Sequence, residues 1–393
     1  TWVRAEKLSL PEKAHLLGQG YVKGNQEYEN KKEEIDELNS KLYHGDSEAM
    51  AVYKRTRKWS LDYYDLFYRR FDTKFDKLYF ESQVAESGKK IVLKKLGKVF
   101  EKSEGAIIFN GEKYGLHKRV FITQDGNSTY EAKEMGLVPL QYKDFPFDLN
   151  IHVVANEQSG YFQVVFKALE LIDKKFQARE YHLPMGMVQL VGKKMSSRTG
   201  VIVTVDGLLE EVKSLLAKLI TSEDLNEKEI EEVKEKGTVA AVKYSVLKTD
   251  TKSNVMFDME RSVALDGNSG PYLQYTYARC KSILRKAPAS VCQLADYGEA
   301  KQSNFSKEEL DLLRTVYKFP EVAQEAAEKY APNLICNFVF DLAQLYNNFY
   351  NTHSVLQAPT KEQKHFRLLL TSAVAQIIQN SLYLCGIQTL DRM

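Results

Sequence analysis

The sequence has few cysteines, no long apolar run and no low-complexity segment. Its four cysteines, Cys280, Cys292, Cys336 and Cys385, are widely spaced, so the C-x-x-C pairs of zinc and redox sites are absent and free thiols in a reducing compartment are expected. No stretch approaches the ~20 uncharged apolar residues that span a bilayer. The N-terminus also lacks a basic region followed by an apolar run. We therefore expect a cytoplasmic protein without a membrane partner.

A charge excess of either sign is also missing. Lysine and arginine total 55, and aspartate and glutamate total 53, so a nucleic-acid partner would have to be bound by local basic patches rather than by bulk charge. The 393 residues, of which 44% are hydrophobic and 27% charged, are typical of a soluble folded enzyme with about two or three domains.

Helical and β-rich segments are unevenly distributed in the first half of the chain. Residues 27–75 are highly charged with helical periodicity, and Gly45-Asp46-Ser47 predicts a break and a cap before the helix that follows. Short β-rich runs then occupy 106–109, 119–123, 151–155, 187–191 and 201–205. Their interleaving with helical segments predicts an α/β layer with a largely parallel sheet.

The chain after Asp206 is predicted to be almost entirely helical. Gly237, Pro288, Pro332 and Gly386 are expected near helix ends. No internal repeat of fixed period is found. A boundary between an α/β domain and an all-helical domain is therefore expected near Asp206.

The segment 192–200 has glycines at both ends, two adjacent serines and three cations, and lies between two predicted strands. Its glycines allow movement, and its cations can neutralise the charge of transferring phosphates. An ordinary solvated hairpin turn fits this composition equally well. The order of the residues favours the first interpretation, because Lys194-Met195-Ser196-Ser197-Arg198 resembles the lysine-methionine-serine signature loop of class I aminoacyl-tRNA synthetases. The resemblance implies that ATP and the leaving pyrophosphate are bound by the catalytic residues Lys194, Ser196, Ser197 and Arg198.

The segment upstream of this loop is similar to the one that lies along the adenine ring in that family. It reads His182-Leu183-Pro184-Met185-Gly186-Met187-Val188. The resemblance implies that the residues contacting ATP, in addition to Lys194, are His182, Gly186, Met187 and Val188. The alternative is a buried strand entrance with a satisfied histidine.

A further group of residues follows predicted strands. Tyr130 and Glu134 come after the turn 125–128, and Gln158 comes after the strand 151–155, at the carboxyl end where open α/β sheets bind ligands. A carboxylate with a phenol or amide oxygen matches the planar donors of a guanidinium. This stretch resembles the arginine pocket of arginyl-tRNA synthetases, which typically have a tyrosine, an aspartate four residues later and a glutamine; Glu134 replaces the aspartate. In the alternative, Tyr130 packs against the sheet and Glu134 is a solvated helix charge.

The run from Asp266 to Arg279 gives the strongest family match. Pro271 suits a first helical turn capped by Ser269 or Gly270, and the helix is expected to end at Lys286. One face carries Tyr272, Tyr275 and Arg279, and another carries Leu273, Tyr277, Cys280 and Leu284. Aromatic and guanidinium groups together suit unstacked RNA bases, although an aromatic helix face is more often core. The run resembles the first helix of the arginyl-tRNA synthetase anticodon-binding domain, which implies that Tyr272, Tyr275 and Arg279 contact the anticodon.

The remaining helices resemble the rest of that domain. A core stripe is formed by Leu334, Phe338, Leu342, Leu345 and Phe349 and is flanked by Tyr346 and Tyr350. The resemblance implies that both tyrosines stack on the anticodon, while Tyr346 could instead complete the core. An apolar helix is expected over 366–385. The tail from Gly386 to Met393 is similar to the family's C-terminal tail, which adds Met393 to the anticodon contacts and indicates a complete C-terminus.

One signature of class I synthetases is missing from the sequence. None of the seven histidines lies in a His-x-Gly-His pattern, which holds the ATP phosphates in that class, and the chain opens with Thr1. The resemblance covers nearly the whole chain and starts downstream of that signature. We therefore expect a fragment of a longer enzyme that is inactive alone, or a short protein that works with a separate N-terminal piece.

The resemblance implies a fold, a domain order and a function. The expected fold is an α/β catalytic domain, the second half of a Rossmann-type nucleotide-binding fold with a helical insertion, followed by an all-α anticodon-binding helical bundle. The expected domains are 1–206 with an insertion at about 25–100, a helical connector at 207–262 and the bundle at 263–393. The expected function is that of an arginine-tRNA ligase, with ATP as substrate and Mg²⁺ accompanying it, and with neither a protein metal site nor a tightly bound cofactor.

Arginine, ATP and arginine-specific tRNA are the expected partners of this protein, which is expected to be a monomer. In the implied reaction the arginine carboxylate attacks the α-phosphorus of ATP, giving an adenylate and pyrophosphate, before transfer to the terminal ribose of the tRNA. One rival hypothesis is a non-catalytic tRNA-binding module, which has no need of the signature loop. Another is a synthetase for a different amino acid, which Glu134 leaves open.

Overall fold

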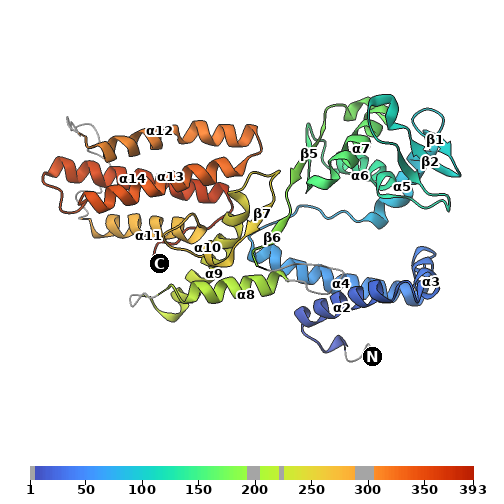
Figure 1. The fold of residues 1–393 in the computed structure, drawn as a ribbon, viewed down its shortest axis with the longest axis horizontal. Coiled ribbons are helices and arrows are strands. Elements are labelled where there is room, and N and C mark those ends of the chain that lie inside the picture. Colours follow the sequence, from blue (N-terminus) through green and yellow to red (C-terminus); the bar gives the residue numbers. More distant parts are fainter. Residues whose placement is uncertain (1–4, 193–203, 221–224, 288–304) are drawn as a thin grey trace. The chain divides into compact units, whose positions relative to one another are not determined.

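The structure is a computed structural model that describes residues 5–192, 204–220, 225–287 and 305–393. The chain forms two compact units, each assembled from separate stretches of sequence (Figure 1). The α/β unit comprises Phe75–Val188 and Thr249–Val255, and the helical unit comprises Thr1–Lys74, Gln189–Lys248 and Met256–Met393. The units are therefore discontinuous in sequence, whereas the domain ranges expected from the sequence are continuous.

The α/β unit alternates helices with short strands, as the sequence predicts. Its helices are α5 (Glu81–Lys94), α6 (Tyr130–Asp144) and α7 (Ser159–Ile172), with the short 3-10 helices η1 (Gly111–Tyr114), η2 (Asn156–Gln158) and η3 (Lys174–Phe176). Its strands are β1 (Glu101–Ser103), β2 (Ala106–Phe109), β3 (Arg119–Ile122), β4 (Asn150–Ala155) and β5 (Glu180–Met185). Strand β2 has the predicted bounds, and β1 was not predicted.

These strands form two small sheets, so the prediction of a largely parallel sheet is wrong. Strands β1, β2 and β3 form an antiparallel sheet, and β4 pairs with β5 in parallel. The reason lies in the connections. Glu104 and Gly105, both at positive φ, join β1 to β2, and such a short link can connect only antiparallel neighbours. The link from β4 to β5 contains α7, the kind of crossover that parallel strands require.

Helices α5 and α6 approach closely because each carries a glycine where they meet. A Cβ atom on Gly88 would lie 1.9 Å from the carbonyl oxygen of Ala132, and one on Gly136 would lie 2.5 Å from that of Val84. The core beside them contains the aromatic rings of Phe100, Phe109, Phe121, Phe162 and Phe176. This packing fixes α6, the helix that carries Tyr130 and Glu134.

The helical unit begins with the charged helices α2 (Leu10–Glu27), α3 (Lys32–Tyr43) and α4 (Ser47–Arg70). The predicted break and cap are confirmed: the Asp46 side chain accepts hydrogen bonds from the backbone nitrogens of Glu48 and Ala49, at 3.1 and 2.9 Å. Because these bonds satisfy backbone donors that have no partner within the helix, Asp46 defines where α4 starts.

The helical unit continues with α8 (Val205–Ala217), α9 (Glu227–Leu247) and the short α10 (Met259–Ser262). Strand β6 (Val188–Leu190) pairs with β7 (Val255–Phe257), which lies in the part predicted to be helical. The predicted strand 201–205 is wrong at Val205, which begins α8 after the capping residue Thr204; residues 201–203 lie outside the described residues. The prediction that Gly237 marks a helix end is also wrong. It lies inside α9, where a Cβ atom would come 2.4 Å from Cδ2 of Leu216.

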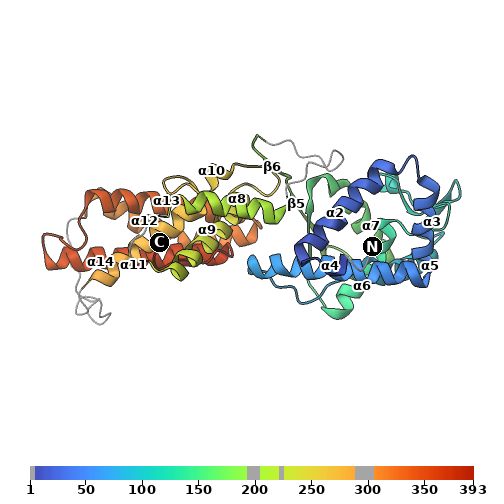
Figure 2. The same ribbon diagram turned by 90° about the horizontal axis from the view of Figure 1, so that it is seen from below.

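The bundle comprises α11 (Gly270–Lys286), α12 (Lys307–Glu328), α13 (Pro332–Thr352) and α14 (Lys361–Leu384). These helices share one buried core and run alongside one another in both ribbon views (Figures 1 and 2). The bounds predicted for α11 are confirmed, and the Ser269 hydroxyl accepts from the backbone nitrogen of Tyr272 at 3.1 Å. Pro332 starts α13, and Gly386 follows α14 at a φ of 64°.

The thiols within the described residues, Cys280, Cys336 and Cys385, are free, as predicted, and they are also buried. Cys292 lies outside the described residues. The Sγ atoms of Cys336 and Cys385 are 3.7 Å apart, which is thiol contact rather than a disulfide, because a disulfide bond is close to 2 Å long.

Candidate functional site

A cavity of about 1100 Å³ opens on the bundle. Its walls come from α11 between Tyr275 and Lys286, the end of α13 with the loop that follows, and the last residues of the chain. Residues predicted to contact an anticodon line it, namely Tyr275, Arg279, Tyr350 and Met393, and so do the cations Arg285, Lys286 and Arg392. The fold therefore brings predicted residues from separate parts of the sequence to one concave surface. We call it the bundle cavity.

Arg279 lies between two tyrosine rings in the bundle cavity. Its Cζ atom is 4.9 Å from the ring centroid of Tyr275 and 5.0 Å from that of Tyr350. Each contact contributes roughly 0.5–1 kcal/mol at an exposed site, because the face of an aromatic ring attracts a cation. The Tyr350 ring also remains exposed. The cavity thus presents a cation and an accessible aromatic surface side by side, a combination suited to phosphates and unstacked bases.

Asn347, on α13, makes the polar contacts that hold Arg279. Its Oδ1 accepts a hydrogen bond from Nη1 of Arg279, and its Nδ2 donates to the Tyr272 hydroxyl at 2.9 Å and to Oγ1 of Thr276 at 3.1 Å. Asn347 was not among the residues predicted to contact the anticodon. The sequence feature that could have indicated it is a polar residue next to Tyr346, on a helix with a strong apolar stripe.

Tyr272 and Tyr346 lie in the core of the bundle, at 8% and 0% exposure. The Tyr272 ring packs on Phe340 at 5.8 Å, and the Tyr346 hydroxyl donates to Oγ1 of Thr371 at 3.3 Å. The prediction that their rings are free to meet RNA is therefore wrong. Both helices are covered on more than one face by their neighbours, so Tyr346 completes the core. Tyr272 is linked to the cavity residue Arg279 through Asn347.

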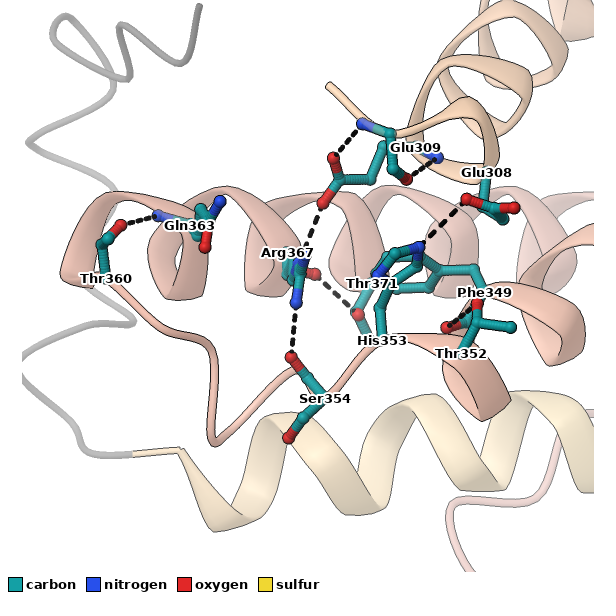
Figure 3. A network of polar contacts seen from close by, with 11 residues as sticks. Glu308, Glu309, Phe349, Thr352, His353, Ser354, Thr360, Gln363, Arg367 and Thr371 are labelled. Atoms are coloured by element: carbon teal, nitrogen blue, oxygen red, sulfur yellow. Dashed lines mark hydrogen bonds and ion pairs between the residues drawn. The ribbon is translucent and has the colours of Figure 1, made fainter. Parts of the chain in front are cut away.

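A network of polar contacts fixes the loop that forms one wall of the bundle cavity (Figure 3). Arg367, on α14, donates from Nε to Oε1 of Glu309 at 2.8 Å and from Nη1 to the backbone oxygen of Ser354 at 2.9 Å. Nε2 of His353 lies 3.0 Å from Oε2 of Glu308, and this hydrogen bond lowers the pKa of Glu308 to about 2. The network connects a wall of the bundle cavity to the start of α12 and to α14.

The C-terminal tail is held by contacts to its backbone. Nζ of Lys243 donates to the backbone oxygen of Gly386 at 2.5 Å, and Nε2 of Gln274 donates to that of Gln388 at 2.7 Å. Gln274 is buried on α11, the helix that also carries Arg279. These bonds place Met393, at the end of the tail, on the bundle cavity.

Among the described residues predicted to contact ATP, His182 lies within β5, and Gly186, Met187 and Val188 follow that strand. Nε2 of His182 is 3.1 Å from the backbone oxygen of Val154, and its ring stacks on Phe162 at 4.7 Å. The histidine therefore has the polar partner expected in the alternative interpretation. These contacts also fix the orientation of its ring within the parallel strand pair.

The turn after β5 is held through its backbone. The backbone nitrogen of Gly186 donates to the oxygen of Thr251 at 2.7 Å, and that of Met187 donates to Oδ1 of Asn254 at 2.9 Å. A Cβ atom on Gly186 would lie 2.0 Å from the backbone oxygen of Ser253, so only glycine fits. The side chains of Met187 and Val188 remain exposed.

Two residues of the predicted arginine pocket are exposed. Tyr130 is the first residue of α6 and 66% exposed, so the alternative in which it packs against the sheet is wrong. Gln158 ends η2 directly after β4, beyond the carboxyl end of that strand as predicted.

Glu134, one turn along α6, differs from them because its carboxylate is largely buried. Burial raises its pKa, with Glu180 adding to the shift and His152 opposing it. Its Oε2 atom has no hydrogen-bond partner within the described residues. The alternative of a solvated helix charge is therefore wrong, and the site holds a carboxylate oxygen that would be satisfied by a ligand bearing N–H donors.

The predicted signature loop lies outside the described residues. This applies to Lys194, Ser196, Ser197 and Arg198. The structure describes the approach to the loop: β6 is followed by Val191, whose backbone nitrogen donates to the oxygen of Phe257 at 3.0 Å, and by Gly192 at a φ of 76°.

Family models match both parts of the chain. Residues 4–259 match the tRNA synthetases class I (R) catalytic domain, and residues 273–393 match the DALR anticodon binding domain. The chain belongs to the arginyl-tRNA synthetase family. The bundle cavity therefore lies in the part that matches an anticodon-binding domain. The presence of a class I catalytic domain does not favour the non-catalytic tRNA-binding module.

Curated relatives of this synthetase chain are arginine–tRNA ligases. One from Bacteroides thetaiotaomicron is 33% identical over 100% of this chain and 67% of its own length. One from Flavobacterium psychrophilum is 36% identical over 89% of this chain and 58% of its own length. The synthetase chain thus spans roughly two thirds of the length of such relatives.

Solved structures agree on the fold. The Thermus thermophilus arginyl-tRNA synthetase superposes with a TM-score of 0.79 at 23% identity, covering 96% of this chain and 69% of that one. The Plasmodium falciparum arginyl-tRNA synthetase gives 0.76 at 21% identity, covering 93% and 63%. The expected fold, a class I catalytic domain followed by a helical anticodon-binding domain, is confirmed.

Proposed function

We propose that this chain supplies the amino acid pocket, part of the ATP site and the anticodon-recognition surface of an arginine-tRNA ligase. The ligase activates arginine with ATP and transfers it to arginine-specific tRNA. One observation carries the proposal: Arg279 is stacked between Tyr275 and Tyr350 in a cavity of the matched anticodon-binding domain.

In this proposal, anticodon bases stack on the exposed Tyr350 ring while cavity cations contact the phosphates. Arg285, Lys286 and Arg392 line the same cavity. Base stacking on an aromatic side chain contributes roughly 1–3 kcal/mol per base, and phosphate contacts make binding dependent on salt. Met393 adds an apolar surface at the end of the tail. Tyr272 and Tyr346, being buried, support these residues and do not contact RNA.

Arginine is bound in the α/β unit by Tyr130, Glu134 and Gln158. The Glu134 carboxylate pairs with the guanidinium, whose N–H donors satisfy the oxygen that has no partner among the described residues. An amino acid without such a donor group would leave this buried oxygen unsatisfied, and that penalty favours arginine over neutral side chains.

ATP is bound along β5 and the turn that follows it, by His182, Gly186, Met187 and Val188, and by the signature-loop residues Lys194, Ser196, Ser197 and Arg198. The cations of the loop neutralise charge on the departing pyrophosphate. Mg²⁺ accompanies ATP through its phosphates; within the described residues, no group of three or more His, Cys, Asp and Glu side chains could hold a metal ion.

We also propose that the protein is monomeric and cytoplasmic. No helix in the described part of the chain combines the length and the apolar character needed to cross a membrane.

Binding of this chain to arginine-specific tRNA transcripts tests the proposal. Transcripts with the natural and with an altered anticodon are compared at one fixed salt concentration, because affinities without a stated salt cannot be interpreted. We expect the altered anticodon to weaken binding, and Arg279→Ala to remove most of that difference. Arg314→Ala is the matched control, since Arg314 is an exposed arginine on α12 whose ion pair to Asp311 lies outside the bundle cavity.

Equal binding of both transcripts would contradict anticodon recognition by this cavity. Calorimetric titration with arginine, lysine and citrulline tests the pocket separately, and preference for an amino acid other than arginine would support the rival synthetase hypothesis.

A further inference from the structure

The amide of Asn347 lies where the core of the bundle meets the cavity. It contacts Arg279 on one side and Tyr272 and Thr276 on the other. We infer that Asn347 is a positioning residue for anticodon recognition, which holds the Arg279 guanidinium between Tyr275 and Tyr350, and that Tyr272 acts on RNA only through it. The inference rests on the proposed function.

The orientation of the Asn347 amide is determined by its neighbours. A guanidinium can only donate, so the atom that faces Arg279 must be the carbonyl oxygen Oδ1. The Nδ2 group then points to two oxygens, the Tyr272 hydroxyl at 2.9 Å and Oγ1 of Thr276 at 3.1 Å. The Thr276 hydroxyl uses its own proton on the backbone oxygen of Tyr272, at 3.0 Å, which leaves its lone pairs for Asn347. All three contacts are therefore compatible with one amide orientation.

The anchors of this amide are rigid. Tyr272 and Thr276 are buried on α11, and the Tyr272 ring packs on Phe340. Arg279, on the same helix but facing the cavity, has a long side chain that carries about 2 kcal/mol of rotamer entropy when it is free. A hydrogen bond from a fixed amide restricts that freedom before RNA arrives, so less entropy is lost on binding.

The neutral character of Asn347 matters for RNA binding. Arg279 forms no ion pair within the described residues, so its hydrogen bond to Asn347 fixes the guanidinium without cancelling its charge. An aspartate at this position would also hold Arg279, but it would neutralise the cation that meets the phosphates. Position and charge can therefore be separated by mutation.

The test measures affinities for the natural and anticodon-altered transcripts over a series of salt concentrations. The variants are Asn347→Ala, Asn347→Asp and Tyr272→Phe. Asn348→Ala is the matched control, because Asn348 is the next residue of α13, is exposed and does not line the bundle cavity. Circular dichroism melting shows whether each variant is folded. Tyr272→Phe keeps the aromatic ring, so it remains informative if Asn347→Ala unfolds.

The variants are expected to separate discrimination from salt dependence. Asn347→Ala should reduce the ratio of the affinities for the natural and altered transcripts roughly tenfold, which is the expected effect of losing a hydrogen bond to a charged group. The salt dependence of binding should stay the same, because Arg279 keeps its charge. Asn347→Asp should keep more of the discrimination. It should also make the negative slope of log K against log salt shallower, by about 0.7 for one lost phosphate contact on single-stranded RNA. Tyr272→Phe should resemble Asn347→Ala with a smaller loss.

Two results would overturn the inference and are distinguishable. If folded Asn347→Ala and Tyr272→Phe discriminate between the transcripts like wild type while Arg279→Ala does not, the positioning role is wrong and the proposed function stands. If wild type itself binds both transcripts equally, the proposed anticodon recognition fails, and there is nothing for Asn347 to position.

Discussion

Replacing Arg367 with methionine should destabilise the bundle locally. Arg367 and Glu309 form an ion pair with side-chain exposures of only 9% and 1% (Figure 3). Removing one partner of a buried pair typically costs about 3–5 kcal/mol, because the remaining charge stays desolvated without its counter-charge. The backbone oxygen of Ser354 also loses its bond to Arg367, which adds about 1 kcal/mol.

The free energy lost in Arg367→Met should be near the lower end of this combined range, about 4 kcal/mol. Glu309 retains a hydrogen bond from the backbone nitrogen of Ser306, at 2.9 Å, in the capping box that starts α12. Adding Glu309→Gln to Arg367→Met removes the buried charge as well as its partner. The free energy lost in the double variant should therefore be smaller than the sum of the losses in the two single variants. A double-mutant cycle measures this difference.

Hydrogen exchange followed by mass spectrometry, over peptides from α12 and α14, is the appropriate assay. A chain with more than one unit does not unfold in a single step, and exchange reports the local opening free energy. Arg314→Met is the control, because Arg314 and Asp311 form an ion pair on the same helix with exposures of 70% and 33%, and exposed pairs contribute about 0–1 kcal/mol. A change of less than about 1 kcal/mol for Arg367→Met would refute the reasoning.

Further predictions concern both units. Burial raises the pKa of Glu134 above its ordinary 4.5. As pH falls through a window above 4.5, the carboxylate should therefore lose its charge, and arginine binding measured by calorimetry should weaken. Glu134→Gln should bind arginine weakly at every pH. Gly88→Ala should destabilise the contact of α5 with α6 by about 1–3 kcal/mol, measured by hydrogen exchange, because its Cβ would lie 1.9 Å from the Ala132 oxygen; unchanged exchange would contradict the close packing. His353 lowers the pKa of Glu308 to about 2 from 4.5, so the stabilisation is complete above pH 4.5 and is lost as pH falls towards 2. His353→Gln should remove this part of the acid sensitivity in exchange at the start of α12.

Local features were predictable where short-range chemistry decides them. The start of α4 at Asp46 and the start of α11 at Ser269 follow from capping side chains, and both are found. Gln158 was placed beyond the carboxyl end of β4 because the strand and its end are local properties of the sequence. The family resemblance was equally local, resting on short runs of residues, and the family match confirms it.

Sheet direction and glycine function were not predictable in the same way. The β-rich runs were found, but their parallel arrangement was wrong for β1 to β3, because direction depends on which strands pair. Gly237 was interpreted as a helix end, whereas it allows α8 to approach α9. The conformational freedom of glycine is the same at a helix end and at a contact between helices. Only the presence of a neighbouring helix distinguishes the two positions.

The sequence by itself determined the helices, their caps and the residue types available for RNA and arginine. The tertiary structure decided which of those residues are accessible: Tyr275 and Tyr350 face the bundle cavity, while Tyr272 and Tyr346 are in the core. It also brought Asn347 to Arg279 from another helix. The physical reason is that periodicity places a side chain on a face of its helix, but burial depends on which other helices cover that face.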